Sequence, residues 1–111
     1  MVYHIMHMNT PVIDVITNEN NTSLTYTKFV PDSPKQPFWG ENITIARFYN
    51  FLKSRCYEDS RRDLPEILAY HGLKSNNPYE WVKISHGVTY EDFFWIKFDD
   101  ECITWEDVKI R

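Results

Sequence analysis

The chain has 111 residues, of which 42% are hydrophobic and 16% aromatic, against only 3 glycines. This composition excludes a disordered or collagen-like chain, because burial of so many apolar side chains can offset the entropy lost on folding. Asp and Glu outnumber Lys and Arg by 16 to 12, which argues against a protein that mainly grips nucleic-acid phosphates. We expect one domain over residues 1–111.

The N-terminal third of the chain predicts β-structure. Residues 11–17 and 22–30 are rich in β-branched and aromatic side chains, and three of the four residues between them are asparagines, which favour turns. These two segments are typical of a β-hairpin. Residues 2–8 fit either a further strand or an irregular start. Residues 31–40 contain three prolines and a glycine and predict a loop.

Helical periodicity begins near residue 43. Apolar side chains recur at helical spacing over residues 45–56, and two further short helices are predicted over 63–72 and 77–87, each closed by a glycine. In the second helix, Asp63 and Glu66 have the spacing of a capping box.

The C-terminal part returns to strand character. Alternation over residues 93–98 sends Phe94 and Ile96 to one face and Trp95 to the other. One face can fill the core, so the other must be covered by the N-terminal hairpin or by a partner protein. Residues 102–110 fit either a return strand or an irregular tail. Strands, helices and strands in this order predict an α+β fold, with a hairpin region over 1–35.

The sequence offers no catalytic or cofactor-binding motif. It has no GxSxG, no glycine-rich phosphate loop and no HExxH, and Cys56 lies on the apolar helix face like a small core residue. The two cysteines, Cys56 and Cys102, are too few to build a disulfide scaffold. We therefore expect a protein that is not an enzyme and holds no cofactor.

The four histidines do not predict a metal site. His4 and His7 are three residues apart, but their context is strand-like and no third ligand is near in sequence. His71 and His86 each precede a helix-ending glycine, where a histidine can bond the last helical carbonyls. The N-terminus lacks the basic and apolar regions of a signal peptide, and no apolar run is long enough to cross a membrane, so a cytoplasmic location is expected.

Two charged regions are candidates for contact with a partner. The basic residues Arg47, Lys53, Arg55, Arg61 and Arg62 form a cluster that fits either a nucleic-acid contact or a solvated surface paired with nearby acids. Residues 91–107 hold seven acidic side chains against one lysine. There the candidate partner-binding residues are Phe93, Trp95, Asp99, Asp100, Glu101, Trp105, Glu106 and Asp107. The alternative is an ordinary acidic loop with tryptophans that anchor the core.

Several short motifs over residues 36–110 occur in a recognisable order. They are FLKSRC, SRRDLPEIL, HGL, HGVTYEDFFWIKF and TWEDV. In this order and spacing the segment resembles the N-terminal accessory segment that precedes the kinase core in HipA-like serine/threonine kinases. The resemblance implies an accessory domain, because the ATP-binding core, which follows this segment in those kinases, has no counterpart here. It also implies a protein partner, a separately encoded HipA-like kinase of a toxin–antitoxin system.

Two other functions remain open from the sequence. A small acidic protein without catalytic motifs also suits an inhibitor of a host defence nuclease, of the anti-CRISPR type, that acts by protein binding or nucleic-acid mimicry. Direct DNA binding through the helix with Arg47, Lys53 and Arg55 and the helix after it has the form of a helix-turn-helix, but the net charge of −4 argues against it.

Overall fold

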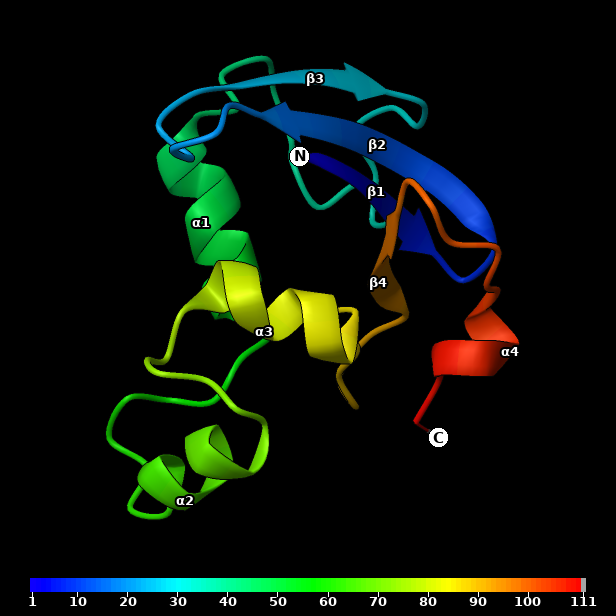
Figure 1. The fold of residues 1–111 in the computed structure, drawn as a ribbon. Coiled ribbons are helices and arrows are strands. Elements are labelled where there is room, and N and C mark those ends of the chain that lie inside the picture. The colour runs from blue at the N-terminus through cyan, green and yellow to red at the C-terminus, as the bar shows by residue number, and fades with distance from the viewer. Residues whose placement is uncertain (111) are drawn as a thin grey trace.

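Four antiparallel strands form one sheet in the order β3-β2-β1-β4 in the computed structural model, which describes residues 1–110 (Figure 1). The strands are β1 (Val2–His7), β2 (Thr10–Thr17), β3 (Leu24–Lys28) and β4 (Phe94–Phe98). The first three follow one another as hairpins, and β4 returns from the C-terminal part of the chain to pair with β1. The predicted hairpin is confirmed, and residues 2–7 form a strand.

Four short helices complete the α+β fold. They are α1 (Ile45–Lys53), α2 (Leu64–Tyr70), α3 (Pro78–Ser85) and α4 (Trp105–Val108). Thr44 and Asn77 cap α1 and α3, since their side-chain oxygens accept backbone N–H groups of the first turn. The expected capping box of α2 is wrong, because the Asp63 carboxylate bonds Arg61 and makes no cap bond.

The main core lies between the sheet and the two helices α1 and α3. Tyr3, Ile5 and Ile96 from the sheet pack there with Phe48 of α1 and Val82 of α3, and none of the five is more than 1% exposed. Burial of such side chains contributes roughly 1.5–3 kcal/mol each. This core positions the C-terminal end of α1 beside β4.

A second, smaller core covers the opposite face of the sheet. Met6 and Trp95 lie there beneath Trp105 of α4, and Trp95 is fully buried. The C-terminal tail is therefore neither a strand nor irregular over 105–108, because a capping box between Thr104 and Asp107 starts a helical turn. The predicted alternation of β4 is correct, and α4 covers its second face.

The segment 57–76, here called the α2 arm, lies away from the sheet at the end of the molecule in Figure 1. Leu64 is its only buried residue. Asn76 fixes the arm to α3 by accepting from the Trp81 indole (2.6 Å), and its amide also donates to the Tyr57 carbonyl (3.0 Å) within the arm. The edges of the Tyr57 and His71 rings meet the Trp81 ring at centroid distances of 5.3 and 5.1 Å.

Candidate functional site

The aromatic residues of the C-terminal segment lie mostly inside the molecule. Trp95 is fully buried and its indole N–H donates to the Met8 carbonyl (2.6 Å), while Trp105 is 5% exposed. Of the three predicted aromatic contacts, only Phe93 is substantially exposed, at 39%. The two tryptophans therefore anchor the second core and do not offer a surface to a partner.

Most carboxylates of the acidic segment bond to other parts of the same chain. Glu101 joins His86 (2.7 Å) and the Phe98 amide (2.8 Å), and Asp107 accepts from the Thr104 amide (2.8 Å). A hydrogen bond from Asn9 holds the pKa of Glu106 below its ordinary value. These acids fix the turn after β4 and the helix α4, which leaves Asp100 as an exposed carboxylate at the turn.

Asp99 has a partner on the sheet. Its carboxylate lies 2.8 Å from Nε2 of His4, and the Nδ1 atom of the same ring lies 2.7 Å from Asp14. Burial alone would lower the pKa of His4, but the two hydrogen bonds to carboxylates outweigh it and raise the pKa. Within residues 1–110 no three His, Cys, Asp or Glu side chains converge as metal ligands.

The basic cluster divides in the structure. The side chain of Arg55 is only 4% exposed and lies against Asp92 (2.5 Å), with further bonds to the carbonyls of Gly87 and Phe94. Arg47 donates to the carbonyls of Trp39 (2.9 Å) and Asn42 and thereby closes the loop before α1. Neither arginine presents a free guanidinium, so the five basic residues do not form one nucleic-acid surface.

The remaining basic residues lie at the base of the α2 arm. Arg61 is paired with Asp63 and stacks over the ring of Tyr57 (4.7 Å to its centroid), and Lys53 lies 4.0 Å from Asp59. Arg62 is exposed. These ion pairs agree with the alternative interpretation of the basic cluster, a solvated surface paired with nearby acids.

The two histidines at helix ends have different environments. His86 adopts a left-handed backbone (φ 57°) and its ring bonds Glu101, so it does not cap the carbonyls of α3 with its side chain. His71 packs its ring against Trp81 and Tyr70. Cys56 is half-buried, and burial raises the pKa of its thiol to about 11, which keeps it protonated and a poor nucleophile near neutral pH.

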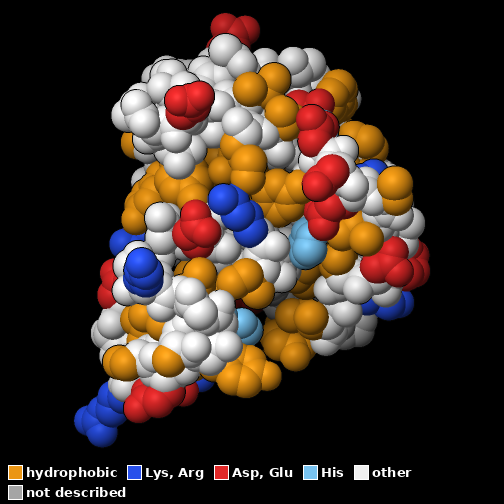
Figure 2. Space-filling model, in the orientation of Figure 1, with side chains coloured by type: hydrophobic (Ala, Val, Ile, Leu, Met, Phe, Trp, Pro, Cys, Tyr) orange, Lys and Arg blue, Asp and Glu red, His pale blue; other side chains and the backbone are white. Residues whose placement is uncertain are grey.

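An apolar groove of about 560 Å³ lies where the α2 arm meets the rest of the molecule. It is here called the interaction groove. Four of its side chains are large, apolar and exposed, namely Tyr57 (39%), Ile84 (42%), Tyr90 (69%) and Ile110 (44%). Figure 2 shows hydrophobic side chains gathered around a hollow between α2, α3 and the C-terminus. Such a group of exposed apolar side chains is a candidate binding surface.

The sequence did not predict the interaction groove. Its walls come from the end of α1, the end of α2, α3, residues 88–91 and Ile110. Of the two predicted charged clusters, the basic one contributes Arg55 and the acidic one contributes Glu91. The exposed tyrosines and isoleucines of the groove follow no periodic pattern in the sequence. They come together only because the α2 arm packs against Trp81.

Comparisons with known proteins do not add a relative. No protein-family model matches the chain, and neither a curated protein nor a solved structure matches it. Among residues 1–110, no helix has the length and apolar character that crossing a membrane requires.

Proposed function

We propose that the protein is a non-catalytic regulatory protein that binds a HipA-like kinase through the interaction groove. The observation that carries this proposal is the group of exposed apolar side chains that line the groove. Aromatic side chains at the centre of an interface contribute most of its binding energy, and Tyr57 and Tyr90 are of that kind.

The resemblance supports the choice of partner. Every residue that lines the groove lies within residues 54–110, inside the segment that resembles the accessory part of HipA-like kinases. In those kinases the ATP-binding core follows this segment directly. Ile110 lines the groove, so a kinase core in the corresponding position would lie against it. The regulation expected is a change in kinase activity on binding within a toxin–antitoxin system.

A binding experiment with a purified HipA-like kinase from the same genome tests the proposal. We expect a complex by isothermal titration calorimetry, and we expect Tyr90→Ala to weaken it by at least about 2 kcal/mol, roughly 30-fold, as central aromatic residues do. Phe29→Ala is the matched control, because Phe29 is 53% exposed and does not line the groove. Kinase autophosphorylation measured with and without the protein tests the regulatory part.

Two outcomes would contradict the proposal. Equal weakening by Tyr90→Ala and Phe29→Ala would place the interface elsewhere. Absence of binding to any HipA-like kinase of that genome, with inhibition of a defence nuclease instead, would favour the anti-CRISPR alternative. In that case Asp100→Lys should weaken inhibition, since Asp100 is an exposed acid of the turn that follows β4.

A further inference from the structure

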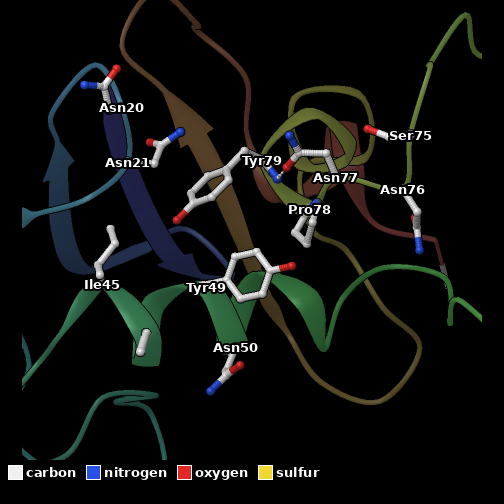
Figure 3. A pocket seen from close by; sticks show the side chains of 11 residues that line it. Asn20, Asn21, Ile45, Tyr49, Asn50, Ser75, Asn76, Asn77, Pro78 and Tyr79 are labelled. Carbon is white, nitrogen blue, oxygen red and sulfur yellow. Dashed lines mark hydrogen bonds between the residues drawn. The ribbon is translucent and has the colours of Figure 1, made fainter.

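A second hollow, of about 670 Å³, shares no residue with the interaction groove, although α3 contributes side chains to both. Its walls come from the β2–β3 loop, from α1, and from the loop that enters α3 (Figure 3). Its volume is in the range of small-molecule sites. Five of the eight asparagines in the chain line it, although they lie in three separate segments. They are Asn20, Asn21, Asn50, Asn76 and Asn77.

The asparagines divide into those that build the wall and those that remain available. Asn76 holds the α2 arm, and the Asn77 side chain caps α3 by accepting from the Tyr79 amide (3.0 Å). Within residues 1–110, the amide groups of Asn20, Asn21 and Asn50 make no side-chain hydrogen bond. Each therefore retains both donor and acceptor capacity for a ligand.

Two tyrosines supply the apolar part of the hollow. The rings of Tyr49 and Tyr79 lie 5.9 Å apart between centroids and are inclined by 49°. Figure 3 shows the Tyr79 ring between the amide of Asn21 and the ring of Tyr49. Because the two rings are not parallel, they do not form a slot for a flat nucleobase. They instead offer two inclined faces to a puckered ring with C–H groups on its side.

The hollow offers no charged side chain to an ionic ligand, and its only electrostatic bias comes from the first turns of α1 and α3. None of the side chains that line it is charged. Burial raises the pKa of Tyr79, so its hydroxyl also stays neutral at physiological pH. A phosphate or carboxylate would lose hydration here without gaining a cation, which is unfavourable.

We propose that this hollow binds a neutral saccharide. A sugar ring combines an apolar C–H face, which suits Tyr49 and Tyr79, with neighbouring hydroxyls that both donate and accept, which suits the amides of Asn20 and Asn21. The hollow is open, so a monosaccharide or disaccharide should bind weakly, with a dissociation constant on the order of 1 mM. This site does not depend on the proposed binding of a kinase, since the two surfaces have no residue in common.

Saturation-transfer NMR on the full chain with a panel of neutral mono- and disaccharides tests the proposal. We expect transfer to at least one neutral sugar, and loss of the signal in Tyr49→Ala. Tyr79→Phe removes only a hydroxyl, and Asn21→Gly keeps the left-handed backbone of that position (φ 54°) while removing the amide. Each of these two variants should weaken binding by roughly 2–10-fold, the effect of one hydrogen bond.

The controls separate a specific site from general effects. Tyr70→Ala removes an exposed tyrosine outside the hollow and should leave binding unchanged, and an amide NMR spectrum of each variant shows whether it remains folded. Absence of transfer to every neutral sugar would overturn the proposal. Binding that survives Tyr49→Ala in a folded protein would also overturn it. Stronger binding of uronic acids, sugar phosphates or nucleosides would contradict the ligand class.

Discussion

Two regions of the molecule are stabilised by different interactions. One region is the sheet with α1 and α3, and the other is the α2 arm. All ten of the largest fully buried side chains belong to the sheet, α1 and α3, and none belongs to residues 57–76. The arm depends on three hydrogen bonds of Asn76 and on ring contacts with Trp81. Regions with little apolar burial open with smaller free energies than the core. The interaction groove lies at the boundary between these two regions, where a partner can bind both.

The largest expected effect is at Arg55, which joins the end of α1 to β4. Replacing it in Arg55→Met leaves the Asp92 carboxylate and the Gly87 and Phe94 carbonyls without their guanidinium. Removal of one partner of a fully buried ion pair costs about 3–5 kcal/mol, and because the Asp92 side chain is 37% exposed, the loss here should lie at the low end, about 3 kcal/mol. Chemical denaturation measures the loss. Arg61→Met is the matched control, because the Arg61–Asp63 pair is exposed and its loss should change the stability far less.

The stability that is lost in Arg55→Met should also depend on pH. Burial alone would raise the pKa of Asp92, but the bonds from Arg55 outweigh it and lower the pKa. A lowered pKa in the folded state gives stability that is present above the unfolded pKa of about 3.9 and is lost as the pH falls through the folded pKa. The difference in stability between the natural chain and Arg55→Met should therefore shrink in acid. Similar losses for Arg55→Met and Arg61→Met would mean that Arg55 is not the buried link described here.

An intermediate effect, confined to the arm, is expected for Asn76→Ala. The change removes the bonds to Tyr57 and Asp59 and leaves the buried Trp81 indole N–H without its acceptor. An unsatisfied buried donor costs about 1–3 kcal/mol. Hydrogen exchange should accelerate over residues 57–76 and remain unchanged in β1 and β2. Asn20→Ala, which removes an amide without a side-chain bond, is the control. Equal acceleration in the sheet would show that arm and sheet unfold as one unit.

Local patterns in the sequence were sufficient for the elements with regular spacing. Alternation around Trp95 and Ile96 predicted a strand with large apolar side chains on both faces, one of them facing the core, and the helical spacing of Phe48 and Leu52 predicted the buried face of α1. The four-residue helix α4 was not predicted, because one capped turn is too short for a periodic signal. Because α4 covers Trp95, the main reason to expect an aromatic strand exposed to a partner no longer applies.

The candidate sites were harder to predict than the fold, because they depend on contacts between distant segments. Arg55 and Arg61 lie in the same basic cluster, yet one is buried against Asp92, 37 positions later, and the other is paired at the surface with Asp63. Charge in the sequence does not show which carboxylate an arginine will meet. The interaction groove and the asparagine-lined hollow likewise assemble from several segments and become visible only once the arm is docked on Trp81.

The smallest expected effect concerns His4, which links β1 to β2 and to the turn after β4. A carboxylate only accepts hydrogen bonds, so the contacts to Asp14 and Asp99 use both ring nitrogens as donors, which requires the protonated ring. The raised pKa of His4 then gives stability that is fully present below its unfolded pKa of about 6.5 and is lost as the pH rises through the folded pKa. Because Asp99 is 70% exposed, the contribution should be at most about 1 kcal/mol.

Two variants show how much of the pH-dependent stability comes from each of the two carboxylates. His4→Gln should remove the decline in stability above neutral pH, and Asp99→Asn should reduce it, since the less exposed contact to Asp14 remains. NMR titration of the His4 ring measures the same quantity directly. A ring pKa below 6.5, or an unchanged pH profile in His4→Gln, would show that Asp14 and Asp99 do not stabilise the protonated ring. The turn after β4 would then be held by the bonds of Glu101 to His86 and to the Phe98 amide rather than by His4.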